Sequence, residues 1–220
     1  MKALLAVHKR VDHHPQLHRR LAALATNSVG ERRVKPVIAE ITRPGDCVWD
    51  VGAQVGTYTR QFLELVGLVG HVVAFEPIPE NVTLLRSLGH EAQLTVVEAA
   101  LADRDGMTSF IISGKKNGGI SHIGESPDGV NVRVARGDSI LQEGIPKPDV
   151  IKIDVEGFEG DVLNGLPKVL EGTRCLVIEV HFAAMSRRGM PNEPVRIIDL
   201  LRNQGFTMRW IDTSHLLARR

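Results

Sequence analysis

Short apolar runs alternate with amphipathic stretches along most of this chain. Strands are predicted at residues 48–51, 71–76 and 94–97, where β-branched and aromatic residues gather between glycine, proline and polar breakers. Between them, residues 57–66 and 77–88 place apolar side chains three and four positions apart, as one face of a helix does. Strand and helix alternating over short connections predict a right-handed, parallel winding.

After residue 101 the pattern becomes antiparallel and then returns to strand and helix. Two period-two strands are predicted at 107–113 and 130–135, around the long polar loop 114–129. Gly137, Asp138 and Ser139 are expected to cap a short helix at Ile140. The later elements are a fourth strand at 149–157, a helix at 158–170 that Pro167 kinks or divides, a fifth strand at 174–180, a helix at 193–203 closed by Gly205, and a final strand pair at 206–211 and 215–218.

The chain divides by charge into an arm and a main domain. Residues 1–43 carry nine Lys or Arg against three Asp or Glu, so their net charge of +6 leaves −5 for residues 44–220. Apolar spacing predicts helices at 15–24 and 34–41. We interpret 1–43 as a basic helical extension that could cover the binding edge as a lid, although a solvated helix face is the usual explanation of such charge.

Composition indicates the class of protein and the compartment in which it works. Its 220 residues, 43% hydrophobic and 24% charged, are ordinary for a globular domain. The apolar run at 3–7 is too short for a signal peptide, and no stretch reaches membrane length, so we expect a cytoplasmic protein without a membrane partner. Cys47 and Cys175 are expected to be small core residues. Whether the protein forms a homo-oligomer stays open.

A glycine turn follows the first strand and points to a ligand. Its sequence is Asp50-Val51-Gly52-Ala53-Gln54-Val55-Gly56, which matches neither the G-x-G-x-x-G of dinucleotide sites nor a phosphate-binding P-loop. It resembles the D-x-G-x-x-x-G loop of S-adenosylmethionine-dependent methyltransferases. A glycine turn in any α/β protein is the alternative. Glu76 ends the second strand twenty residues after Gly56, where Rossmann-like units place an acid on ribose hydroxyls, or it simply favours the next helix N-terminus.

The fourth strand carries charge at alternate positions. Lys152, Asp154 and Glu156 are costly in a central strand unless they are paired or lie at its carboxyl edge, where open α/β sheets bind ligands. The fifth strand ends in Glu179-Val180-His181 at the same edge. These residues therefore form the candidate reactive centre.

Three stretches together resemble the FkbM family of methyltransferases: 50–59, 75–81 and 151–159. The resemblance covers about residues 34–201; Gln54 stands where the family usually has Asn, and the basic arm has no counterpart. It implies an α/β, Rossmann-like class I fold with a mostly parallel seven-stranded sheet, helices on both faces and an antiparallel C-terminal strand pair. It also implies S-adenosylmethionine as donor and a hydroxyl acceptor on a small molecule or glycan, such as a sugar, polyketide or other natural product.

The resemblance also assigns residues. Gly52, Ala53 and Gly56 would lie against the methionine part, Asp50 would hold the loop or the amino group, and Asp154, Glu156 and His181 would face the methyl. The full set expected around the cofactor is Asp50, Gly52, Ala53, Gly56, Thr57, Glu76, Pro77, Glu98, Ala100, Leu101 and Asp154.

Methyl transfer by in-line displacement gains from a general base on the acceptor hydroxyl. His181 is the favoured base because of its intrinsic pKa, with Asp154 or Glu156 orienting or replacing it, and His122 in a loop is the competitor.

Two alternatives stay open. Asp154, Glu156, Glu179 and His181 could bind Mg²⁺ or Mn²⁺, as in catechol-type methyltransferases, but we favour their pairing with Lys152 and with one another and expect no metal. An RNA-binding module using the basic arm is disfavoured, because only 4% of residues are aromatic and the sheet edge is acidic.

Overall fold

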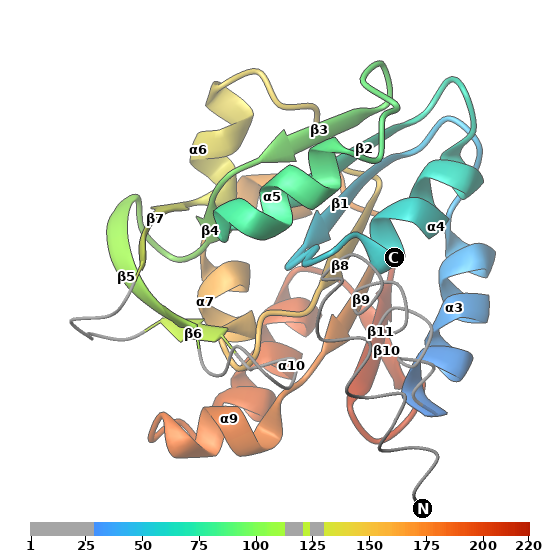
Figure 1. Ribbon diagram of the computed structural model, residues 1–220. Coiled ribbons are helices and arrows are strands. Elements are labelled where there is room, and N and C mark those ends of the chain that lie inside the picture. The colour runs from blue at the N-terminus through green and yellow to red at the C-terminus, as the bar shows by residue number, and fades with distance from the viewer. Residues whose placement is uncertain (1–28, 113–120, 124–129) are drawn as a thin grey trace, which may run out of the picture.

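The computed structural model describes residues 29–112, 121–123 and 130–220 and is built on one large sheet (Figure 1). Its strand order is β10-β11-β9-β8-β1-β2-β3. The strands are β1 Cys47–Val51, β2 His71–Phe75, β3 Leu94–Val97, β8 Val150–Ile153, β9 Cys175–Glu179, β10 Thr207–Trp210 and β11 His215–Arg219. All pairs are parallel except those that β11 makes with β9 and β10. The predicted fold class is confirmed.

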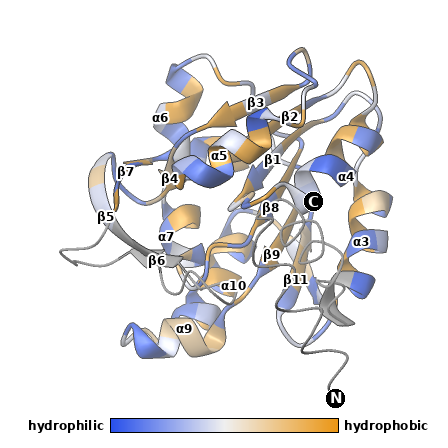
Figure 2. Cartoon of the chain, in the orientation of Figure 1, coloured by the Kyte–Doolittle hydropathy of each residue, from blue (hydrophilic) through white to orange (hydrophobic). Residues whose placement is uncertain are grey.

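Both faces of the sheet are covered, so its strands read as nearly continuous apolar runs. On one face, Val48 and Val72 pack beneath α3 (Val29–Ile41) and α4 (Thr57–Val66). On the other face, Trp49 and Ile151 pack against helices of the second half of the chain. Figure 2 shows the orange strands between helices that carry both orange and blue residues. This alternation along each strand fixes which side chains reach the carboxyl edge.

The antiparallel strands form a separate sheet. β5 (Gly106–Ile112) pairs with β7 (Val130–Ala135) and with β6 (Ser121–Ile123), and β7 also pairs in parallel with β4 (Ala100–Leu101). The predicted antiparallel pairing is therefore present. These strands form a second sheet, in the order β4-β7-β5-β6, that the sequence pattern did not separate from the seven-stranded sheet.

The predicted helix at 158–170 is divided, as Pro167 suggested. α7 (Glu159–Asn164) ends before α8 (Pro167–Leu170) begins. The predicted cap of α6 (Gly137–Gln142) is wrong, because Arg136 occupies the N-cap and no side chain caps the helix. Instead, Asp138 Oδ1 accepts hydrogen bonds from Lys168 N at 2.9 Å and Val169 N at 3.2 Å, so it caps α8.

The C-terminal region contains one helix that the sequence pattern did not indicate. α9 (Phe182–Arg187) starts after Val180 and His181, which follow β9, and the predicted α10 (Glu193–Asn203) comes next. α5 (Pro79–Arg86) lies between β2 and β3 as expected.

The structure addresses part of what was expected of the N-terminal arm, the two cysteines and membrane association. α3 contains the predicted helix at 34–41, whereas the predicted helix at 15–24 lies outside the described residues. Cys47 and Cys175 are free thiols, and burial raises the pKa of Cys47 to about 12. None of the described helices combines the length and the apolarity that a membrane span requires.

Candidate active site

The candidate site lies where the direction of strand order reverses. From β1 the chain continues to β2 and β3 on one side, whereas β8 and β9 lie on the other side. Ligands of open α/β sheets bind at the carboxyl ends of the strands beside such a point. Loops after β1, β2, β8 and β9 therefore define the region to inspect.

The glycine turn after β1 is folded tightly against β2 and β8. Gly52 N and Ala53 N both donate to Phe75 O at 3.1 Å. Gly52 has φ +79°, and a Cβ on it would lie 1.9 Å from the carbonyl oxygen of Asp154. Gly56 has φ +84° and forms the N-cap of α4. Only glycine fits this close approach, so the turn packs on the end of β8 with no side chain between them.

Glu76 connects the turn to the next helix. Its Oε2 accepts from Gln54 N at 2.9 Å, and its Oε1 accepts from Ile78 N at 2.9 Å and from Asn81 Nδ2 at 3.2 Å. Burial raises the pKa of this carboxyl, while these hydrogen bonds oppose the rise. Because Oε2 accepts a single protein hydrogen bond, it retains capacity for a ligand hydroxyl, and the residues present fit the predicted ribose contact.

Asp50 holds the turn rather than facing a ligand. It is fully buried, its Oδ2 accepts from Thr59 Oγ1 at 2.7 Å, and its Oδ1 lies 3.5 Å from Lys152 Nζ. Lys152 Nζ also lies 3.3 Å from Asp154 Oδ2. Burial lowers the pKa of Lys152, but Asp154 and Asp50 outweigh it and the net shift is upward. The charges of the central strands are thus paired, as the sequence analysis favoured.

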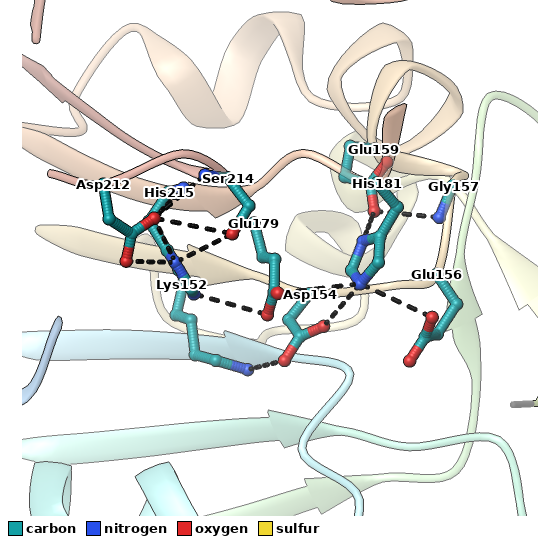
Figure 3. Close-up of polar contacts among 10 residues, drawn as sticks. All are labelled: Lys152, Asp154, Glu156, Gly157, Glu159, Glu179, His181, Asp212, Ser214 and His215. Atoms are coloured by element: carbon teal, nitrogen blue, oxygen red, sulfur yellow. Dashed lines mark hydrogen bonds and ion pairs between the residues drawn. The ribbon is translucent and has the colours of Figure 1, made fainter. Parts of the chain in front are cut away.

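His181 lies among carboxylates from three elements (Figure 3). Its Nδ1 donates to Glu159 Oε1 at 2.7 Å. Its Nε2 lies 3.4 Å from Glu156 Oε2, 3.8 Å from Asp154 Oδ1 and 4.0 Å from Glu179 Oε1. Burial alone lowers the pKa of His181, but the hydrogen bond to Glu159 and the facing carboxylates raise it to about 9. The imidazole is therefore charged at neutral pH in this arrangement.

Glu156 takes a backbone conformation that is rare for its residue type. Its φ of +54° lies in the left-handed region, and Gly157 follows with φ +98°. Such strain tends to collect at functional sites. Burial raises the pKa of the Glu156 carboxyl, His181 lowers it, and Asp154 and Glu179 raise it further. The strained turn thus directs a carboxylate with a raised pKa toward His181.

A second histidine adjoins this group and was missed from the sequence. His215 Nε2 lies 3.3 Å from Glu179 Oε2, and its Nδ1 lies 2.9 Å from Asp212 Oδ1. Glu179 consequently lies between the two histidines (Figure 3). The Asp212-x-x-His215 spacing in a predicted turn, and Glu159 in the acidic stretch after the fourth strand, were the available signals.

The remaining expected residues are dispersed. Glu98 is exposed at the end of β3 and pairs with Arg86 at 3.4 Å. Ala100 and Leu101 form β4 of the second sheet. Thr57 and Pro77 are half-buried beside the glycine turn and Glu76. His122 lies in β6, and its side chain is outside the described residues.

The cluster also has the composition of a metal site. Asp154, Glu156 and His181 each offer a ligand atom, and these atoms lie within 4.8 Å of one another. Glu159 holds the other ring nitrogen of His181, as carboxylates commonly do behind histidine ligands. Glu179 lies farther out and bonds toward His215. A protonated histidine surrounded by carboxylates, with no metal between them, would make the same contacts.

Comparison with known proteins places these features in a family. Residues 50–208 match the Methyltransferase FkbM domain. The chain is 30% identical to the hexuronic acid methyltransferase AglP of Haloferax volcanii over 69% of this chain, and it spans 63% of that relative's length. It is 26% identical to the 2-O-methyltransferase NoeI of Sinorhizobium fredii, over 76% of this chain and 75% of that protein.

The fold has a solved counterpart. A methyltransferase FkbM from Methylobacillus flagellatus superposes with a TM-score of 0.56 at 15% identity, covering 84% of this chain and 50% of that one. At this identity the likeness concerns the fold.

Proposed function

The chain belongs to the FkbM methyltransferase family, and from that premise we propose that it transfers a methyl group from S-adenosylmethionine to a hydroxyl oxygen of a sugar or related natural product. The observation that carries the proposal is the contact of the glycine turn with the reactive cluster. Gly52 packs on the carbonyl of Asp154, whose side chain faces His181. Donor loop and acidic cluster are thus adjacent at one sheet edge. The name of AglP, a hexuronic acid methyltransferase, supports a sugar acceptor.

The residues of the turn would bind the donor. Gly52 and Gly56, both at positive φ, shape the turn against which the methionine part would lie, and Glu76 Oε2 has capacity for a ribose hydroxyl. Buried Asp50 keeps the turn in place through Thr59 and Lys152. S-adenosylmethionine, when bound, supplies a methyl group on a positively charged sulfur. The sulfur is the leaving group, opposite the attacking acceptor oxygen.

The acidic cluster would position and deprotonate the acceptor. We assign the proton-accepting role to Glu156, because Glu159 and the facing carboxylates keep both nitrogens of His181 protonated at neutral pH. This differs from the base favoured by the sequence alone. Asp154 is occupied by Lys152, whereas Glu156 is held toward His181 by its left-handed backbone. His181 would donate a hydrogen bond that orients the acceptor or Glu156 itself.

The test separates donor binding from turnover. Calorimetry with S-adenosylhomocysteine measures the first, and a screen of sugars and glycosides with labelled donor identifies an acceptor for the second. Glu156→Gln should lose about 10² to 10⁴ in turnover while donor affinity is retained. A protein that binds a nicotinamide dinucleotide but no sulfonium donor would overturn the proposal. Full turnover in Glu156→Gln with loss in His181→Gln would return the base to His181.

Metal-assisted methyl transfer is the second candidate, and the observation that favours it is the convergence of Asp154, Glu156 and His181. An ion there would lower the pKa of the acceptor hydroxyl. Turnover that survives exhaustive chelation supports the metal-free reaction. Turnover that disappears and returns with Mg²⁺ or Mn²⁺ supports the second candidate. The RNA-binding alternative depends on the basic arm, most of which lies outside the described residues, and we do not propose it.

A further inference from the structure

Glu179 has no part in the reaction proposed above, although it adjoins the reactive cluster. It is the last residue of β9 and pairs directly with His215 of β11. Lys152 of β8 pairs with Val177, two positions before Glu179. Because side chains alternate along a strand, those of Lys152, Glu179 and His215 lie on one face of the sheet. Glu179 is therefore on the same side of the sheet as the pair of Lys152 with Asp154.

The final hairpin holds one oxygen of Glu179 in place. Glu179 Oε2 lies 3.3 Å from Nε2 of His215, which is buried. The other ring nitrogen of His215 lies 2.9 Å from Asp212 Oδ1, and that oxygen also accepts from Ser214 N at 2.9 Å and from His215 N at 2.8 Å. The turn thus fixes His215, and His215 orients the carboxylate of Glu179.

The other oxygen of Glu179 lies toward His181, where hydrogen-bond acceptors outnumber donors. Glu179 Oε1 is 4.0 Å from His181 Nε2, and Glu156 Oε2 is 3.4 Å from the same nitrogen. That nitrogen carries a single hydrogen, so it can serve only one of the two carboxylates. Lys152 pairs with Asp154 instead. Among the other residues that the structure describes, none donates a hydrogen bond to the carboxylate of Glu156 or to Glu179 Oε1, so both have capacity for donors from a ligand.

We propose that Glu156 and Glu179 bind two neighbouring hydroxyls of the acceptor, so that the substrate is a saccharide with a vicinal diol. Glu156 takes the hydroxyl that receives the methyl group, and Glu179 takes the hydroxyl beside it. A ligand that displaces water from a carboxylate without supplying a donor leaves that charge unpaired, which is costly. A diol supplies one O–H to each carboxylate, and both carboxylates lie within 4.0 Å of one nitrogen. This inference rests on the proposed function and deepens it by naming the second contact and the class of acceptor.

Deoxy analogues test the diol directly. Labelled donor and a panel of methyl glycosides of hexoses, 6-deoxyhexoses, pentoses and hexuronic acids identify an acceptor, and NMR of the product locates the methylated oxygen. The acceptor is then compared with the two analogues that lack the hydroxyl on either neighbouring carbon. We expect kcat/KM of the wild type to fall about ten- to a hundredfold for at least one analogue, mainly through KM. Equal kcat/KM for the acceptor and both analogues, or no turnover of any glycoside by protein that binds S-adenosylhomocysteine, would overturn the inference.

Variants assign the lost contact to Glu179. Glu179→Gln should raise KM for the acceptor about tenfold or more and should no longer distinguish the acceptor from the poorer analogue, because the hydroxyl has lost its charged partner. His215→Gln should weaken the same distinction, whereas a merely structural defect would lower the turnover of both compounds alike. Glu171→Gln, whose side chain is 70% exposed beside Lys147, is the control and should change neither value.

The donor separates this inference from the proposed function. Glu179→Gln should bind S-adenosylhomocysteine within about twofold of the wild type. A Glu179→Gln variant that still distinguishes the acceptor from its analogue as the wild type does would overturn the inference. The wild-type comparison of the acceptor with its analogues decides the question if the variants do not fold. Failure of the wild-type protein to bind the donor would overturn the proposed function instead.

Discussion

Gly52 and the carbonyl oxygen of Asp154 are in such close contact that a Cβ at residue 52 would stand 1.9 Å from that oxygen. The contact joins the turn after β1 to the end of β8, which are neighbours in the sheet but a hundred residues apart in the chain. It fixes the turn against the strand that leads to Asp154.

We predict that Gly52→Ala removes donor binding and lowers the free energy of unfolding by about 2–5 kcal/mol, because strain at positive φ and a clash with backbone add together. The matched control is Gly144→Ala, where φ is +87° but nothing lies within 4 Å. It should cost only the strain, about 1–3 kcal/mol, and retain donor binding. Calorimetry with S-adenosylhomocysteine and urea denaturation measure both effects, and normal donor affinity in Gly52→Ala would contradict the close-contact argument.

Glu76→Gln should weaken both the turn and the donor complex. Three N–H donors point at the carboxylate, so an amide group in its place meets at least one of them donor to donor. We expect unfolding free energy to fall by about 1–3 kcal/mol and donor affinity to fall about tenfold or more. Glu80→Gln, exposed in the first turn of α5, is the control and should leave both values unchanged. An unaltered donor affinity in Glu76→Gln would remove Glu76 from the ribose contact.

The contribution of His181 to stability should disappear in alkali. Its pKa is raised from 6.5 to about 9, so the folded state holds the proton more tightly than the unfolded state. The stabilisation is complete below about pH 6.5 and is lost as pH rises through about 9. The difference in urea midpoint between wild type and His181→Gln, measured in EDTA, should therefore be large at pH 6 and small at pH 10. A difference that grows with pH would mean that the ring is neutral in the folded protein.

Glu156→Gly should raise the stability of the protein and lower its turnover. The left-handed backbone at φ +54° costs a non-glycine residue about 1 kcal/mol, which glycine avoids. We expect the melting temperature to rise by a few degrees and turnover to fall at least about a hundredfold. His90→Gly, exposed at φ +62° and far from the cluster along the sheet, should gain the same stability with full turnover. An active Glu156→Gly variant would contradict the role of the carboxylate.

Asp138→Ala should destabilise the protein although the helix that contains Asp138 stays intact. Its carboxylate accepts from the first free N–H groups of α8, thirty residues away. Loss of such a cap costs about 0.5–2 kcal/mol. Ser139→Ala, which removes only an exposed bond to Asp105, should cost less. Equal urea midpoints for the two variants would argue against the cap.

The elements that the sequence predicted best are those whose pattern is local. β1, β2 and β3 were found because apolar runs stand between breakers, and the division before Pro167 follows from the missing N–H of proline. The glycine turn and Glu76 were found because their spacing is fixed by a strand, a turn and a helix in succession. The backbone of the proposed donor site was thus the part that could be predicted locally.

What the sequence did not show depends on contacts across long stretches of chain. Asp138 looked like a cap for its own helix, since nothing local reveals that α8 folds against it. The roles of Glu159 and His215 depend on where β8, β9 and β11 place them. The charge state of His181 follows from those same neighbours, which is why its intrinsic pKa suggested a base and its surroundings indicate a cation.

The order of the site residues along the chain matters for how such proteins diversify. Gly52, Gly56 and Glu76, to which we assign the donor, precede α5, whereas Glu156 and His181, to which we assign the acceptor, follow β8, with the second sheet between them. A single recombination event in that intervening segment would pass on one half unchanged and replace the other. The two halves meet at Gly52 through the backbone carbonyl of residue 154, which every amino acid supplies, and at Asp50 through the side chain of Lys152, which few residues could replace. A new acceptor half would therefore have to keep a cation at position 152 to leave the donor half unchanged.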